Sequence, residues 1–351
     1  MPKASRAAFA FHGVRMCGRS RAVVASRPTM SPRAHSPTEV VASAPARIDL
    51  AGGWTDVPPY TTEVGGAVCN VAIELRAVAT LTQDGGRPTP PDDPLSEAAW
   101  QRARRPPVTI RLHSAIPIGS GLGGSSATGV ALAAALAAWR DESMSADALA
   151  ELSRSTEVET LGLPGGCQDH YAAAHGGALL LRCGATTSAQ AVELSDSTVS
   201  DFEKRAIVAF TGESRMSSRT ITAVLDAYRA NERQTCDALA RMKMLAPRMA
   251  EALSAGDLDE LGRLVAHQWD AQRALHPTIT TPLIDHIVHE VTNAGALGAK
   301  ALGASGGGCV LVIAHADRVE AVRAALAGRA ELLPVRVARS GVQVHVSGGM
   351  N

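Results

Sequence analysis

Pro117-Ile-Gly-Ser-Gly-Leu-Gly-Gly-Ser-Ser-Ala127 is the stretch that decides the fold, and it lies between an alternating apolar segment, Val108–Ser114, and an alanine-rich segment ending near Arg140. The alternation predicts a strand and the alanine-rich segment predicts a helix, so the amides of this phosphate loop are expected at a helix N-terminus. Unpaired N–H groups and the positive end of the helix dipole attract phosphate there. We therefore predict that the loop binds phosphate through Pro117, Gly119, Gly121, Leu122, Gly123, Gly124, Ser125 and Ser126.

The loop is neither a Walker A loop nor a dinucleotide-binding fingerprint. Walker A requires a lysine before its Ser or Thr, and the sequence has no lysine between Lys3 and Lys204. A flexible glycine turn capped by serine is the alternative, but the strand, loop and helix order and the paired serines favour phosphate. The charge of a transferred phosphoryl group must then be balanced by Mg²⁺, amides and arginine.

Two further motifs, Pro45-Ala-Arg-Ile-Asp-Leu-Ala-Gly-Gly-Trp-Thr-Asp56 and Leu302-Gly-Ala-Ser-Gly-Gly-Gly-Cys-Val310, flank the phosphate loop in the sequence. The three motifs together resemble those of the GHMP kinases, the family of galactokinase, homoserine kinase, mevalonate kinase and phosphomevalonate kinase, over about Ala44 to Val346. The resemblance implies a two-domain α+β fold. Its N-terminal ATP-binding domain, ribosomal protein S5 domain 2-like, would cover residues 39–198, and a ferredoxin-like α/β sandwich would cover 199–351.

A phosphoryl-transfer enzyme needs a metal ligand, a group that orients the attacking hydroxyl, and positive charge near the γ-phosphate. By resemblance, Ser126 and Glu157 would hold Mg²⁺, which prefers oxygen ligands. Asp169 stands where galactokinase-like members carry the aspartate that accepts the hydroxyl proton, and Arg47 matches the arginine that pairs with it. Asp169 also suits the N-cap of the next helix, and whether it acts as a base or only orients the hydroxyl stays open.

The first motif also bears on the substrate. Galactokinase has Gly-Glu-His-Thr-Asp where this chain has Gly-Gly-Trp-Thr-Asp, which disfavours galactose. The stretch Gly-Gly-Trp-Thr-Asp-Val-Pro-Pro at residues 52–59 resembles L-fucokinase and bacterial heptose 7-phosphate kinases. Two further stretches, Gly165–Gly177 and Thr211–Ser218, resemble the heptose group more closely. We expect transfer to the anomeric hydroxyl of D-glycero-D-manno-heptose 7-phosphate, with L-fucose or another free sugar as the alternative.

Substrate contacts are expected from Thr55, Asp56, Gly166 and Arg215. Asp56 matches an aspartate that binds sugar hydroxyls in relatives, although by itself it suits an Asx turn. Arg215 either binds a second, sugar-borne phosphate or is a solvated residue at a helix start, and Trp54 either stacks near the sugar or packs the turn. Two rival functions are a non-catalytic GHMP-fold binding or regulatory protein, disfavoured by the catalytic set, and a mevalonate-branch decarboxylase, which would not need the sugar-type first motif.

Composition limits the partners. Lys and Arg number 34, as do Asp and Glu, so the chain has no global basic field for nucleic acid. The six cysteines are scattered without C-x-x-C spacing, as expected of reduced thiols in a cytoplasmic protein. The richest apolar segment, Gly129–Trp139, is too short to span a bilayer. We expect a soluble monomer or homodimer that uses ATP and Mg²⁺, with a sugar or sugar-phosphate substrate and neither nucleic-acid nor membrane partners.

Residues 1–38 contain seven basic residues and no Asp or Glu. An organelle transit peptide, a disordered extension and a start codon placed before a true start at Met30 are all open, and we exclude this segment from the fold. Elsewhere the pattern predicts a loop over Asp84–Pro107 with one helical turn, a connection from Cys183 to Asp196, and helices from Ser218 to Asn293. The predicted helix breaks are at Pro247, Gly256 and Pro277, and the predicted last strands are Leu332–Ala338 and Gly341–Val346.

Overall fold

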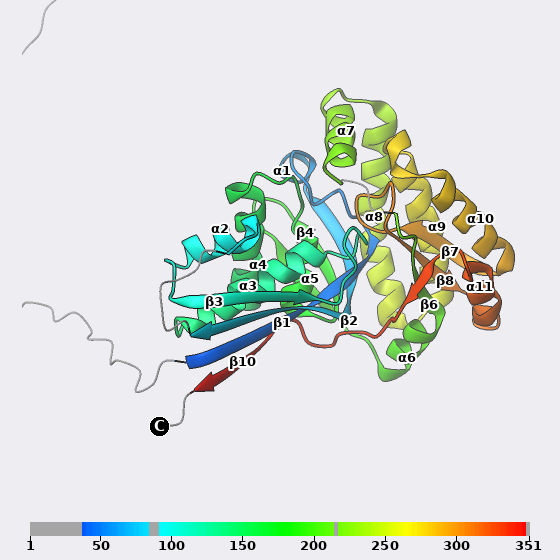
Figure 1. Ribbon diagram of the computed structural model, residues 1–351. Coiled ribbons are helices and arrows are strands. Elements are labelled where there is room, and N and C mark those ends of the chain that lie inside the picture. Colours follow the sequence, from blue (N-terminus) through cyan, green and yellow to red (C-terminus); the bar gives the residue numbers. More distant parts are fainter. Residues whose placement is uncertain (1–36, 84–90, 214–216, 349–351) are drawn as a thin grey trace, which may run out of the picture. The chain divides into compact units, whose positions relative to one another are not determined.

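The computed structural model describes residues 37–83, 91–213 and 217–348, in two lobes that are each built on an antiparallel sheet (Figure 1). Of the segment 1–38 that we excluded from the fold, residues 1–36 lie outside the described residues, as does Arg215, whereas Pro37 and Thr38 begin β1. The N-terminal lobe contains β1 (Pro37–Ala51), α1 (Tyr60–Glu63), β2 (Gly66–Gln83), α2 (Pro94–Arg102), β3 (Val108–Ser114), α3 (Gly124–Trp139), α4 (Ala146–Ser155), the π-helical turn η1 (Thr156–Thr160), α5 (Gln168–His175), β4 (Ala178–Cys183), β5 (Ser188–Val192) and β10 (Gln343–Gly348).

The C-terminal lobe has the βαββαβ pattern of a ferredoxin-like fold. Its elements are α6 (Asp196–Arg205), β6 (Ala206–Phe210), α7 (Ser217–Arg229), α8 (Arg233–Ala255), α9 (Leu258–Arg273), the 3₁₀ turn η2 (Pro277–Ile279), α10 (Pro282–Ala294), β7 (Ala296–Ala301), β8 (Cys309–Ala314), α11 (Val319–Leu326) and β9 (Glu331–Leu333). The strands lie in the order β7-β8-β6-β9 and every pairing is antiparallel. The expected α+β architecture with a helix-covered antiparallel sheet is confirmed.

The N-terminal sheet is organised around the long strand β2. Its strand order is β10-β1-β2-β4-β5, and β3 pairs with the second part of β2, beyond the part that pairs with β4. Helices α3 and α5 pack against β1 and β2, and α8 also packs against both strands (Figure 1). Residues 44–51 of β1 are therefore buried without interruption.

The end of the chain departs from the expected arrangement. The predicted strand Leu332–Ala338 is reduced to β9, which ends before Pro334, because proline has no N–H to donate to a sheet. The following chain crosses back, and β10 pairs antiparallel with β1, with Val346 opposite Val40. Residues that we assigned to the C-terminal domain thus contribute a strand to the first sheet.

Two other local expectations were wrong. The predicted connection from Cys183 to Asp196 contains strand β5, whose short sequence pairs with β4. Pro247 lies inside α8 and does not end it. An interior proline costs about 3 kcal/mol, and burial of the apolar face of α8 offsets that cost. The break between helices lies instead near Asn231, whose φ is 54°.

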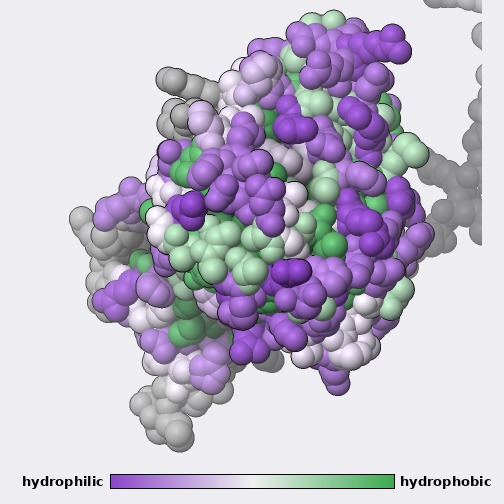
Figure 2. Space-filling view, turned by 90° about the vertical axis from the view of Figure 1, so that its right-hand side faces the viewer, coloured by the Kyte–Doolittle hydropathy of each residue, from purple (hydrophilic) through white to green (hydrophobic). Residues whose placement is uncertain are grey.

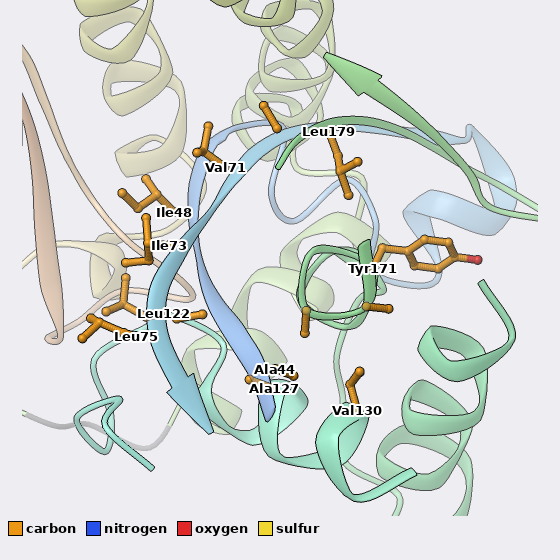
Figure 3. Close-up of a cluster of buried hydrophobic side chains, with 14 of the residues drawn as sticks. Ala44, Ile48, Val71, Ile73, Leu75, Leu122, Ala127, Val130, Tyr171 and Leu179 are labelled. Carbon is orange, nitrogen blue, oxygen red and sulfur yellow. The ribbon is translucent and has the colours of Figure 1, made fainter. Parts of the chain in front are cut away.

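The phosphate loop is anchored in the core of the N-terminal lobe. Leu122 is fully buried and lies beside Ile73 and Leu75 of β2, while Ala127 of α3 lies beside Ala44 of β1 (Figure 3). The Leu122 carbonyl also accepts a 3.1 Å hydrogen bond from the Arg47 amide. This packing fixes the position of the loop relative to β1.

The face of the molecule that carries α10 and α11 is mostly hydrophilic, with smaller apolar patches between the charged side chains (Figure 2). Within the described residues, no helix is long and apolar enough to cross a membrane.

A buried ion pair joins the two lobes. The Nζ atom of Lys300, on β7, lies 2.8 Å from Oδ2 of Asp49, on β1, and donates to the Asp49 carbonyl at the same distance. Lys300 is fully buried and Asp49 is 3% exposed. Burial lowers the pKa of Lys300, and the Asp49 carboxylate opposes that shift.

We expect Lys300→Met to lower the free energy of unfolding by about 3–5 kcal/mol, because it leaves a buried carboxylate without its partner. Urea denaturation followed by circular dichroism measures this loss. Lys204→Met, at an exposed lysine, is the control. Adding Asp49→Leu should recover part of the loss, and a Lys300→Met protein within 1 kcal/mol of the wild type would contradict a role for the pair.

Candidate active site

A cleft of about 540 Å³ collects most of the predicted site residues. Its walls are the turn after β1, the phosphate loop, η1, the start of α5, and Gly303 with Ala304 of the C-terminal glycine motif. The predicted residues that line it are Arg47, Asp56, Pro117, Gly119, Gly121, Gly123, Gly124, Ser125, Ser126, Glu157, Gly166 and Asp169.

Two predicted contact residues do not line the cleft. Leu122 is turned into the core, so within the phosphate loop it serves as an anchor. Thr55 is fully buried, and its hydroxyl donates to the Gly52 carbonyl at 2.7 Å and accepts from the Ala67 amide at 3.1 Å. Thr55 therefore holds the turn after β1 against β2, and the predicted substrate contact is replaced by this structural role.

The phosphate loop leads into α3 as the sequence predicts. Gly123 precedes the helix with a φ of 77° and no side chain caps the first turn, so the first amides of α3 have no partner within the helix. A Cβ on Gly121 would lie 2.5 Å from the Leu302 carbonyl oxygen, and the Cys309 amide donates to the Ser120 carbonyl at 2.8 Å. The C-terminal glycine motif thus supports the phosphate loop from the other lobe.

Arg47 and Asp169 form a buried pair in the cleft. Nε and Nη2 of Arg47 lie 2.8 and 2.6 Å from Oδ1 of Asp169, and Nη1 donates to the Gly121 carbonyl at 2.6 Å. The arginine side chain is 4% exposed, whereas that of Asp169 is 27% exposed. The alternative role of Asp169 as an N-cap is wrong, because α5 begins at Gln168 and its N-cap residue is Cys167.

Asp56 is a second carboxylate in the same cleft. Its Oδ2 accepts hydrogen bonds from the amides of Cys167 and Gln168 at 2.9 and 3.0 Å, so it bridges two distant segments and is not an Asx-turn residue. Its Oδ1 is buried and has no partner among the described residues. Burial raises the pKa of Asp56 to about 6; the Gln168 amide opposes this shift, and the charges of Asp169 and Asp49 add to it.

Gly166 is required by this carboxylate, since a Cβ there would lie 2.0 Å from Oδ2 of Asp56. The glycine therefore sets the space around Asp56 as well as lining the cleft. Trp54 has a φ of 80°, which is rare for a non-glycine residue. Its ring belongs to an apolar cluster that includes Tyr60 and Trp269, and it also lines the cleft; its buried Nε1 lacks a partner among the described residues.

Glu157 lies in the π-helical turn η1, a conformation that is frequent at functional sites. Its carboxylate accepts from Ser125 at 2.6 Å and from Ser126 at 3.1 Å, and Nε2 of His170 lies 3.2 Å away. Burial acts to raise the pKa of Glu157, but the hydrogen bond and charge of His170 and the bonds from the two serines outweigh it, and the pKa is lowered. The predicted metal ligands Ser126 and Glu157 thus lie side by side.

The sequence analysis missed His170, Lys300 and Asp49. A signal existed for His170, because it directly follows Asp169 in a segment predicted to be helical. Lys300 is a lone lysine among Ala, Leu and Gly, a composition typical of a buried segment in which a cation needs a partner. Nothing in the sequence indicates that the partner is Asp49, since the two residues come from different sheets.

Comparisons with known proteins found two matching family models. Residues 95–177 match the family model described as the GHMP kinases N-terminal domain, and residues 249–331 match the GHMP kinases C-terminal model. A bifunctional fucokinase/GDP-fucose pyrophosphorylase from Arabidopsis thaliana is 26% identical over 340 residues, covering 85% of this chain and 32% of the relative. This chain therefore spans about a third of that relative.

A D-glycero-alpha-D-manno-heptose 7-phosphate kinase from Campylobacter jejuni is 27% identical over 293 residues, covering 75% of this chain and 86% of the relative. Among solved structures, a D-glycero-D-manno-heptose 1-phosphate kinase from Bacteroides thetaiotaomicron matches with a TM-score of 0.69 and 24% identity, covering 87% of this chain and 98% of that one. The structural match supports the fold.

We expect Asp56→Asn to stabilise the ligand-free protein by about 1–3 kcal/mol at pH 8, because each raised pKa unit of a carboxyl group costs about 1.4 kcal/mol once the group is ionised. The pKa rises from 3.8 to about 6 on folding. The wild type therefore loses stability relative to the variant as the pH rises through this window, and the two should converge below about pH 4. Urea denaturation at pH 4, 6 and 8 tests this, and a difference that does not depend on pH would argue against it.

Proposed function

Because the chain carries the N-terminal and the C-terminal domain of the GHMP kinases, a family of ATP-dependent phosphotransferases, we propose that it transfers the γ-phosphoryl group of ATP to a hydroxyl of a sugar. The observation that carries this proposal is the Arg47–Asp169 pair. It lies beside the phosphate loop, and a Cβ on Gly123 would lie 3.2 Å from the Asp169 carboxylate. A hydroxyl held by Asp169 would thus be close to a phosphate held by the loop.

The residues of the cleft have different proposed roles. Both contacts of Arg47 to Asp169 are made to Oδ1, so Oδ2 is the oxygen offered to the attacking hydroxyl, as a proton acceptor or an orienting group. The amides at the start of α3 would hold the phosphates. Asp56, with an unpaired Oδ1, would accept a hydrogen bond from another sugar hydroxyl.

Mg²⁺ would be held by Glu157 and Ser126. Oxygen donors suit this ion, which usually takes one or two carboxylates together with substrate phosphates and water. The bound ion would neutralise charge that develops on the phosphates during transfer.

D-glycero-D-manno-heptose 7-phosphate is the substrate that we propose first, with transfer to its anomeric hydroxyl. Two carboxylates in one cleft suit a polyol, and the Campylobacter jejuni relative carries this substrate in its name. L-fucose or another free sugar is the alternative, in line with the Arabidopsis relative. The proposed contact of Arg215 with a second phosphate lies outside the described residues.

We expect Mg-ATP-dependent ADP release with one member of a panel of heptose 7-phosphate, fucose, galactose, mannose and mevalonate. Asp169→Ala should lower kcat by about 10²–10⁴-fold, because the hydroxyl loses its acceptor. Asp169→Asn keeps the shape but not the charge and should be similarly impaired. A coupled ADP assay measures both variants. ATP binding without ADP release for any member of the panel would favour another sugar or a protein that binds without catalysis.

A further inference from the structure

His170 is a buried histidine that neither the sequence motifs nor the proposed chemistry explains. It is 2% exposed and follows Asp169 in the first turn of α5. Its two ring nitrogens face different partners: Nε2 lies 3.2 Å from Oε2 of Glu157, and Nδ1 lies 3.0 Å from the Ser153 hydroxyl. Asp169 contacts Arg47, so two neighbouring residues in the first turn of α5 contact Arg47 and Glu157, respectively.

The contact with Glu157 requires a proton on Nε2 of His170. An ionised Glu157 can only accept, so the proton must be on Nε2. The Ser153 hydroxyl can donate to Nδ1 or accept from it, so it is a suitable partner for the other ring nitrogen. The chain of Ser153, His170 and Glu157 is fully satisfied in this arrangement, and it fixes the plane of the imidazole.

The surroundings leave little freedom for this chain of contacts. A Cβ on Gly129 of α3 would lie 2.4 Å from the Ser153 hydroxyl oxygen, so glycine is required where α3 crosses α4. Glu157 follows directly in the π-helical turn, and its other oxygen is bound by Ser125 at 2.6 Å. Its carboxylate is thus held from α3 on one side and from α5 on the other.

We propose that His170 is a positioning residue that orients the Glu157 carboxylate toward the Mg²⁺–nucleotide complex and ties it to the turn of α5 that carries Asp169. This inference rests on the proposed function for the identity of the metal and the nucleotide. Groups that hydrogen-bond a metal ligand fix its orientation, and their removal commonly costs 10–100-fold in metal affinity or activity. The opposing interpretation is a histidine that only fills space in the lobe.

Two amide variants separate these interpretations. In His170→Gln the side-chain amide reaches about as far as Nε2, so an N–H donor to Glu157 is kept. In His170→Asn the amide reaches only as far as Nδ1, so the contact with Ser153 can be kept but the donor to Glu157 is lost. His175→Asn, one turn along the same helix at a residue paired with Asp147, is the matched control.

The measurement is the Mg²⁺ dependence of binding of a non-hydrolysable ATP analogue to the full chain by calorimetry, without sugar, together with thermal unfolding. We expect the Mg²⁺ concentration for half-maximal binding to rise about 10–100-fold in His170→Asn. His170→Gln should recover most of that affinity, and His175→Asn should resemble the wild type.

Three results would overturn the inference. Wild-type Mg²⁺ dependence in a folded His170→Asn protein would show that Glu157 needs no such support. Equal losses in His170→Asn and His170→Gln would assign the residue to packing alone. A wild-type protein that binds the analogue with no Mg²⁺ dependence would remove the proposed metal role and this inference together, whereas failure of every sugar in the activity panel would leave the binding result intact.

Discussion

The buried guanidinium of Arg47 is the interaction on which the geometry of the site depends. It binds Asp169 from α5 and the Gly121 carbonyl of the phosphate loop, and its own amide binds the carbonyl of Leu122. A buried cation must find such partners, so one side chain on β1 fixes the distance between the loop and the proposed hydroxyl acceptor. The planar, multiply donating guanidinium can hold two acceptors at once.

Support from the second lobe is needed because a glycine-rich loop has little rigidity of its own. Gly303 and Gly121 approach so closely that a Cβ on Gly303 would lie 2.8 Å from the Cα of Gly121. The Lys300–Asp49 pair, whose lysine lies three residues before Gly303 in the sequence, joins the sheets of the two lobes. The cleft is therefore a product of the contact between lobes, and the stability of that contact and the order of the site are coupled.

The site also contains groups whose placement opposes stability. Asp56 is a buried carboxylate with a raised pKa and one unpaired oxygen, and Trp54 adopts an unusual φ. Unpaired buried polar atoms are costly, and strain of this kind gathers at functional sites. Hydroxyls of the proposed sugar would supply partners for the buried Asp56 Oδ1. Glu157, by contrast, is already well supplied with hydrogen bonds in the free protein.

The sequence by itself determined the phosphate loop at the start of a helix, because that depends on short-range periodicity. Its contiguous motifs, through their resemblance to the GHMP kinases, also indicated the two-domain α+β fold and most residues of the cleft. Only the tertiary structure decided that Thr55 and Leu122 face away from the cleft, that β10 returns to the first sheet, and that His170 and Lys300 find Glu157 and Asp49. The physical reason is that side-chain direction and partner choice between distant segments depend on packing, which no local pattern encodes.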